Sequence, residues 1–139
     1  MSEQPKVGSA GILVKSGKYL LGQRNKKDVR GGMWCVPGGG VEFGERLNLA
    51  VCREFKEETN LTVRVIDGFQ SVQQSIREGR HTVMVFKEVD CDNIGRALPT
   101  EELVKLKWFT FREIQDLKIG AAITEMSYAA IWDYYFFKR

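Results

Sequence analysis

The feature that most constrains this chain is a helical stripe that changes character along its length. Between residues 47 and 61, side chains recur at the three- and four-residue spacing of one helix face: Leu47, Ala50, Val51, Glu54, Glu57, Glu58 and Leu61. The first members are apolar, so this face must pack against the rest of the protein. The same face therefore directs three carboxylates toward the protein.

Three glutamates in such positions are costly unless a cation compensates their charge. Like charges at this spacing destabilise a helix by about 0.2–0.5 kcal/mol per pair. Glu57 and Glu58 also lie in the last turn, where the helix dipole disfavours negative charge by about 0.3–1 kcal/mol. Carboxylate oxygens suit Mg²⁺ or Mn²⁺ better than zinc. The pattern predicts a divalent cation on Glu54, Glu57 and Glu58, with a structural Ca²⁺ site or an ordinary solvated helix face as alternatives.

Three consecutive glycines, Gly38, Gly39 and Gly40, come shortly before this helix. Backbone without side chains can approach a metal ion or a phosphate closely. A plain turn is the simpler interpretation of a glycine cluster. Beside an acidic helix, however, the cluster favours phosphate chemistry.

The remaining chain reads as strands in runs, with helices at a few places. The predicted strands are residues 7–14 and 18–24, joined by a turn at Gly17, and then 33–37, 61–66, 68–76, 81–89 and 105–111. Residues 91–103 read as a loop. Thr110 and Glu113 have capping-box spacing for a short helix over 111–117, and 124–137 reads as a C-terminal helix. Without regular alternation of strand and helix, the class is α+β with a mixed sheet.

Size and composition limit the classes of protein. The 139 residues suffice for one domain, 1–139, and 43% hydrophobic with 28% charged residues is typical of a soluble globular protein. No apolar run reaches the roughly 20 residues of a membrane span, and no secretory signal is recognisable. Three widely spaced cysteines indicate reduced thiols in the cytoplasm. The net charge of +3 does not indicate binding to duplex nucleic acid.

The spacing of the charged residues also matches a known family. Gly39 is followed at fixed intervals by Glu45, Arg53-Glu54, Phe55, Glu57-Glu58 and Asn60-Leu61. This pattern resembles the Nudix box of the MutT/Nudix hydrolases, and every charged position is filled. Trp34, Pro37-Gly38-Gly39 and Glu42-Phe43-Gly44-Glu45 are similar to the residues that flank the box. The resemblance covers nearly the whole chain and implies the Nudix fold, a mixed β-sheet sandwiched between helices (α/β/α).

Two residues depart from the usual box. Asn60 stands where the family usually has the glycine that ends the helix in a left-handed conformation, and asparagine is the common substitute there. Phe55 stands where an aliphatic residue is usual, at a position facing the core. Neither residue is a ligand, so catalysis should survive both departures.

The resemblance implies hydrolysis of a nucleoside diphosphate linked to a group X. It implies that Glu54, Glu57 and Glu58, with the Gly38 carbonyl, hold Mg²⁺ or Mn²⁺. Arg53 is similar to the arginine that orients the catalytic helix by pairing with a carboxylate such as Glu45. Glu57 is our first candidate for the base that deprotonates the attacking water. Glu102, in the loop before the last strand, is the second candidate as base or extra ligand, unless it is a solvated loop residue.

The substrate is less constrained. Arg24, at a strand end, is the best candidate to meet the phosphates, along with the backbone of Gly38 and Gly39; Lys26, Lys27 and Arg30 are alternatives that read more simply as loop residues. Phe43, Trp34 and His81 are candidates to contact a base, with packing as the simpler interpretation. The C-terminal aromatic residues, namely Trp132, Tyr134, Tyr135, Phe136 and Phe137, are interpreted as helix packing or the surface of a homodimer.

Some subfamilies carry a proline or a tyrosine about 16 residues after the box, associated with ADP-ribose and dinucleoside polyphosphate substrates. Here that region reads Ser75-Ile76-Arg77-Glu78 and has neither. The short chain most resembles the MutT-type nucleoside triphosphate pyrophosphatases, with ADP-ribose or another nucleotide sugar as the alternative substrate. An alternative of another class is a non-catalytic nucleotide-sensing module, which is expected to have lost the box glutamates.

Overall fold

A mixed sheet forms the centre of the molecule, as the computed structural model shows for residues 3–28 and 30–139. Its order is β3 (Trp34–Cys35), β2 (Lys18–Arg24), β1 (Lys6–Lys15), β6 (Arg80–Asp90) and β5 (Arg64–Arg77). In addition, β4 (Gly38–Gly40) pairs with β1, and β7 (Leu103–Thr110) pairs with β2. The β1–β6 pair is parallel and the other pairs are antiparallel, which confirms the mixed sheet.

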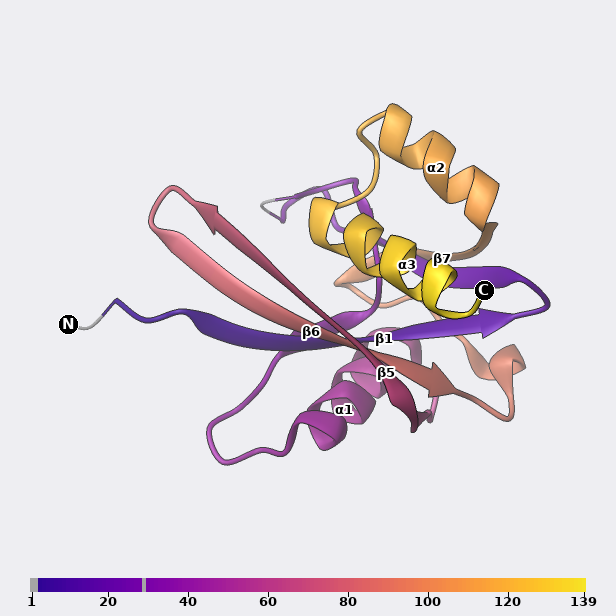
Figure 1. Ribbon diagram of the computed structural model, residues 1–139, viewed down its shortest axis with the longest axis horizontal. Helices are drawn as coiled ribbons and strands as arrows, with labels where there is room; N and C mark the ends of the chain where they lie inside the picture. Colours follow the sequence, from indigo (N-terminus) through magenta and orange to yellow (C-terminus); the bar gives the residue numbers. More distant parts are fainter. Residues whose placement is uncertain (1–2, 29) are drawn as a thin grey trace.

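Helices cover both faces of this sheet (Figure 1). On one face, α1 (Leu47–Thr59) buries Val51 and Phe55 against strand residues such as Leu13 and Val89. On the other, α2 (Phe111–Ile119) and α3 (Glu125–Phe137) bury Ile114 and Ile131 in a second cluster. The predicted α/β/α arrangement is therefore confirmed, with one apolar layer on each side of the sheet.

Local signals placed the ends of several elements correctly. Asn60 ends α1 at φ 64°, in the left-handed conformation that was predicted for it. Thr110 and Glu113 form both hydrogen bonds of the capping box at the start of α2. Phe55 is fully buried, so the ring does face the core.

Three predicted boundaries were wrong. Gly38–Gly40 form a short strand, β4, because their backbone pairs with Gly8–Ala10 of β1, and no side-chain pattern signals such pairing. The two strands predicted over 61–66 and 68–76 are one strand, β5, with an irregularity between Ile66 and Gln70. The predicted loop 91–103 contains a 3₁₀ turn, η1 (Ile94–Arg96), and its last residue already belongs to β7.

Within the two described ranges, each helix is too short or too polar to serve as a membrane span.

Candidate active site

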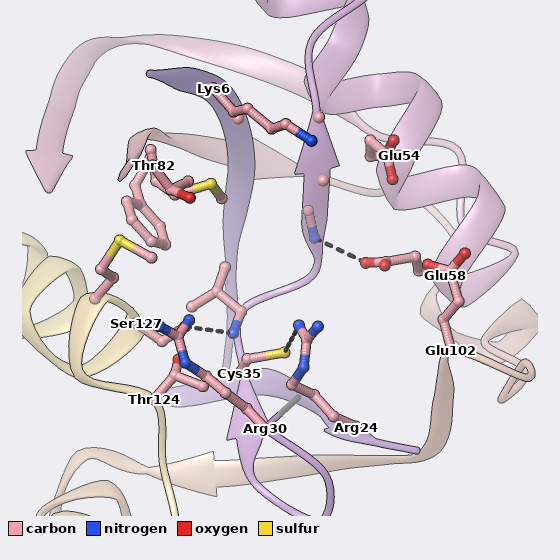
Figure 2. A pocket seen from close by; sticks show the side chains of 18 of the residues that line it. Lys6, Arg24, Arg30, Cys35, Glu54, Glu58, Thr82, Glu102, Thr124 and Ser127 are labelled. Atoms are coloured by element: carbon pink, nitrogen blue, oxygen red, sulfur yellow. Dashed lines mark hydrogen bonds between the residues drawn. The ribbon is translucent and has the colours of Figure 1, made fainter. Parts of the chain in front are cut away.

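The box glutamates border a cavity of about 490 Å³ between α1, β4 and the start of α3 (Figure 2). Its lining brings together residues from both ends of the chain. Four are acidic (Glu54, Glu57, Glu58 and Glu102), three are basic (Lys6, Arg24 and Arg30), and five are apolar (Val7, Val36, Met84, Phe86 and Met126). A cavity lined by acidic, basic and apolar side chains suits a polar ligand that also carries a ring.

Helix α1 presents its three box glutamates to different degrees. Glu58 is buried, with 6% of its surface exposed. The Glu54 side chain is 13% exposed, and the Glu57 side chain is 57% exposed. The stripe prediction is thus correct for Glu54 and Glu58, whereas Glu57 lies at the rim of the cavity because its position has turned toward solvent.

Glu58 is held at the bottom of the acidic wall. Its carboxylate accepts the Gly38 N–H at 2.8 Å, and Glu102 lies against it from the loop before β7 (Figure 2). Burial, reinforced by the contact with Glu102, raises the pKa of Glu58 to about 9. At neutral pH this carboxyl group therefore carries a proton in the absence of a cation. Glu102 lines the cavity and is exposed, so its role as base or extra ligand stays a prediction.

Glu54 lies against the backbone of β4. A Cβ atom on Gly39 would overlap the Glu54 carboxylate, so glycine at this position lets that carboxylate keep its place against the strand. Burial raises the pKa of Glu54, and the neighbouring charges of Glu57 and Glu102 add to the effect against the opposing influence of Arg53. The glycine cluster thus brings bare backbone against the carboxylates, as its sequence position indicated.

Arg53 fixes the geometry of this wall. Its guanidinium makes a bidentate pair with Glu45 at 2.7 and 2.9 Å, and donates to the Gly40 carbonyl at 2.9 Å. It also donates to Glu54 at 2.9 Å and to Glu57 at 3.2 Å. The pKa of Glu45 falls to about 2, chiefly through the hydrogen bond with Arg53. The predicted pairing is therefore confirmed, and it ties the 42–45 loop, β4 and α1 together.

The donor set fits a hard divalent cation in its chemistry. Carboxylate oxygens from Glu54, Glu57, Glu58 and Glu102 border one cavity, and burial, with neighbouring carboxylates adding to it, raises the pKa values of Glu54 and Glu58. In the conformation seen here, Glu57 accepts a hydrogen bond from Arg53, and Glu58 accepts one from the Gly38 N–H. Among the described residues, no three acidic, histidine or cysteine side chains are already arranged to hold a metal ion. The residues fit Mg²⁺ or Mn²⁺, and the ligand role of the Gly38 carbonyl stays a prediction.

Three basic side chains line the cavity, and two of them, Arg24 and Arg30, were candidates from the sequence. Arg24 lines the cavity, where its guanidinium donates to Asp28 at 2.6 Å and lies 4.0 Å from the Cys35 sulfur. Arg30 lines it as well, although the sequence favoured a solvated loop residue there. Lys6, from β1, lines the cavity at the end away from Arg24 and Arg30 (Figure 2).

Other expected contacts are not brought to this cavity. Phe43 lies in the turn that the Glu45 N–H closes onto the Glu42 carbonyl at 2.9 Å; its side chain is fully exposed there and does not line the cavity. Lys26 and Lys27 are exposed and also lie outside the lining. Trp34 packs edge-on against Phe109, with ring centroids 4.9 Å apart, and His81 bonds to Gln74 at 3.0 Å. For the last two, the simpler interpretation of packing or local bonding fits the structure.

Several lining residues carry no sequence signal. Lys6, Thr82 and Ser127 come from β1, β6 and α3, and none of them belongs to a recognisable motif. Ser127 is placed by a long-range contact, since its Oγ accepts the Val36 N–H at 3.0 Å. Lys6 and Thr82 are neighbours in the β1–β6 register. Only the pairing of these segments could have revealed them.

Comparison with known proteins gives a family match and several relatives. A family model described as NUDIX domain matches residues 4–129. The uncharacterized Nudix hydrolase YvcI of Bacillus subtilis is 31% identical over 115 residues, which cover 78% of this chain and 68% of that protein. The solved structure of a NUDIX hydrolase from Nitrosomonas europaea has a TM-score of 0.79 and 26% identity, with 98% of this chain and 92% of that chain covered.

Two relatives carry names that state a substrate. The ADP-ribose pyrophosphatase of Methanocaldococcus jannaschii is 44% identical over 61 residues, and the CTP pyrophosphohydrolase of Escherichia coli is 34% identical over 67 residues. These alignments cover 44% and 48% of this chain. They span 36% and 50% of the two enzymes, so the likeness is confined to part of each.

Proposed function

The chain belongs to the Nudix hydrolase family, whose members act on pyrophosphate bonds, and from this membership we propose that it hydrolyses nucleoside triphosphates to a nucleoside monophosphate and pyrophosphate in a Mg²⁺-dependent reaction. The observation that carries the proposal is the cavity itself. It gathers the carboxyl groups of the acidic wall, Glu54, Glu57, Glu58 and Glu102, and the cationic side chains of Lys6, Arg24 and Arg30 around one space.

The residues of the acidic wall have different roles in this proposal. Glu54, Glu57 and Glu58, with the Gly38 carbonyl, would hold the cation, which supplies charge neutralisation on the diphosphate and acidifies a water molecule. Glu57 is the proposed base, because its carboxylate is the most exposed of the three and can reach a water in the cavity. Glu102 is the second candidate. Arg53 positions Glu54 and Glu57 without touching the reacting atoms.

The basic and apolar parts of the cavity bind the rest of the substrate in this proposal. Arg24 and the backbone of Gly38 and Gly39 would meet the phosphates, since guanidinium and bare backbone N–H groups both suit phosphate oxygens. Met84, Phe86 and Met126 offer an apolar surface for a base. The partial likeness to the CTP pyrophosphohydrolase supports a nucleoside triphosphate.

ADP-ribose, or another nucleotide sugar, is the second candidate substrate. The observation that favours it is the 44% identity to the Methanocaldococcus ADP-ribose pyrophosphatase. A screen with Mg²⁺ over canonical and oxidised nucleoside triphosphates, ADP-ribose, sugar nucleotides, dinucleoside polyphosphates and NADH separates the two. We expect pyrophosphate and a nucleoside monophosphate to be released from triphosphates. If no product is released from any of these compounds, the proposal is wrong.

Glu57→Gln separates catalysis from nucleotide sensing. General base catalysis contributes about 10²- to 10⁴-fold, so we expect kcat to fall by at least about 10²-fold while nucleotide binding persists. Equilibrium binding of a nonhydrolysable triphosphate gives the second readout. A variant with unchanged binding and unchanged function would instead favour the sensing module. A structural Ca²⁺ site would show a rise in Tm with Ca²⁺ and no turnover with Mg²⁺.

Location and assembly complete the proposal. The three cysteines are free thiols, which supports the cytoplasm. Trp132, Phe136 and Phe137 are exposed on α3 and are the proposed surface of a homodimer. We expect no binding to duplex nucleic acid.

A further inference from the structure

A second cavity, of about 470 Å³, borders the candidate active site. Arg24, Arg30 and Thr82 line both cavities. Four of the eight residues around the second cavity are arginines, namely Arg24, Arg30, Arg77 and Arg80, and two are acidic, Asp28 and Glu78. The lining therefore carries a formal charge of +2 next to the place where a diphosphate would bind.

The β5–β6 turn presents two of these arginines together. Glu78 and Gly79 have φ of 42° and 78°, the left-handed pair of a tight two-residue hairpin turn. The turn places Arg77 opposite Arg80 and Ser75 opposite Thr82. Opposite residues and alternate residues of an antiparallel pair project from the same face. All four side chains therefore line one side of the hairpin, toward the cavity.

The arginines lie close together, and their positive charge and hydrogen-bond donors are only partly matched by nearby acceptors. The hydrogen bond of Arg30 goes to the neutral Ser75 hydroxyl, at 3.3 Å. Burial and the nearby charges of Arg77 and Arg24 lower the pKa of Arg30. The buried Nε of Arg24 has no hydrogen-bond partner among the residues that the structure describes. Arg77 pairs with Glu125 at 3.5 Å, in a contact that is largely exposed. Donors and positive charge are thus left for an anion.

We infer that Arg24, Arg30, Arg77 and Arg80 form a distal phosphate subsite, which selects substrates whose group X carries a further phosphate over substrates whose group X is a neutral sugar. The planar guanidinium fork matches phosphate oxygens, and a charge-assisted pair is about twice as strong as a neutral hydrogen bond. The inference rests on the proposed hydrolysis of a nucleotide at the neighbouring cavity. It favours a nucleoside triphosphate or a dinucleoside polyphosphate over ADP-ribose.

Arg77 is the residue with which to test the subsite, because it lines the second cavity and not the first. Arg77→Gln should lower kcat/KM about 10-fold for a nucleoside triphosphate and for a dinucleoside tetraphosphate. It should leave kcat/KM for ADP-ribose and UDP-glucose unchanged. The ratio between the two phosphate-bearing substrates identifies which of them the subsite serves. Equal losses on all four substrates, or no loss on any, would overturn the inference.

Arg64→Gln is the matched control, since Arg64 also lies on β5, pairs with carboxylates and has a side chain 55% exposed, against 57% for Arg77. It should leave all four substrates unaffected.

A binding measurement separates this inference from the proposed function. Inorganic tripolyphosphate, titrated calorimetrically in buffer with a chelator, should bind the wild type and bind Arg77→Gln about 10-fold more weakly, with Arg64→Gln like the wild type. Equal affinities, or no binding to the wild type, would overturn the subsite. If tripolyphosphate binds as expected but no nucleotide is hydrolysed, the proposed function fails and the anion subsite stands.

Discussion

Glu58 combines deep burial with an acidic neighbour, and this determines its protonation. The residue is 6% exposed, and its carboxyl group accepts one backbone N–H and contacts Glu102. Such a group is expensive to ionise, because burial disfavours the charged form and the second carboxylate repels it. Binding of a cation at this wall must therefore displace a proton at neutral pH.

The stability of the cation-free protein should depend on pH through Glu58. The pKa of Glu58 is raised from 4.5 to about 9 in the folded state, so the folded protein binds this proton more tightly than the unfolded chain does. The resulting stability is complete below about pH 4.5 and is lost as the pH rises toward about 9, at up to about 1.4 kcal/mol per pH unit. Urea unfolding in chelator at several pH values, for the wild type and Glu58→Gln, measures this loss as a difference between the two proteins. A difference that stays constant from pH 5 to 9 would contradict it.

At the level of elements, Arg53 joins α1 to the loop before it and to β4. Its partners are Glu45, Gly40, Glu54 and Glu57, so one guanidinium orients two of the box glutamates. A lysine keeps the charge but cannot form the bidentate pair and the further contacts at once. The network therefore depends on the planar guanidinium group of arginine.

Arg53→Lys should lower kcat by about 10-fold or more while changing the free energy of unfolding by less than about 1 kcal/mol, since the pairs are partly exposed. Steady-state kinetics and urea unfolding on the same preparation check both parts. Glu45→Gln should act in the same direction, and the double variant should lose less than the product of the single losses, because both act on one pair. Fully multiplicative effects would argue against a shared role.

The end of α1 gives a test of local conformation. Asn60 holds φ at 64° and its side chain donates to the Arg96 carbonyl at 3.1 Å in an exposed contact. Asn60→Ala should lower the free energy of unfolding by about 1–2 kcal/mol, because a Cβ without a local polar partner is strained in this region. Asn60→Gly is the matched control and should change it by less than about 1 kcal/mol. Equal losses for both would show that the Arg96 contact, and not the backbone, matters.

At the level of the whole molecule, two apolar layers share one sheet. Phe55 belongs to the layer under α1 and Ile131 to the layer under α3. Trp108 packs against the first layer and Trp34 against the second, so fluorescence reports on both. Because β1 and β2 contribute to both layers, we expect the predicted single domain to unfold as one unit.

Phe55→Ala and Ile131→Ala should each lower the midpoint of the same unfolding transition. The free energy of unfolding should fall by about 3–5 kcal/mol for Phe55→Ala and by about 2–5 kcal/mol for Ile131→Ala, because apolar burial is lost and a cavity is left behind. Tryptophan fluorescence and far-UV circular dichroism should give coincident curves for the wild type and for both variants. Two separated transitions, each sensitive to one substitution, would show that the layers fold independently.

The sequence alone determined what depends on local spacing. The stripe from Leu47 to Leu61 and the capping box at Thr110 follow from helix periodicity and short-range backbone preferences. The resemblance to the family added the pairing of Arg53 with Glu45 and the left-handed Asn60. Side chains three, four or eight positions apart are brought together by one helix and the loop before it, whatever the rest of the chain does. For this reason the acidic residues of the site could be predicted from the sequence.

The tertiary structure decided the other half. It made a strand of Gly38–Gly40, turned Glu57 to the rim, set Glu102 against Glu58, and joined Lys6 to Arg30 across one cavity. It also placed Arg77 and Arg80 beside that cavity through a hairpin register. These arrangements depend on strand pairing and on packing of layers between distant segments, for which no local pattern of side chains exists. The charge opposite the carboxylates, and with it the part of the cavity that would select group X, therefore emerged only from the fold.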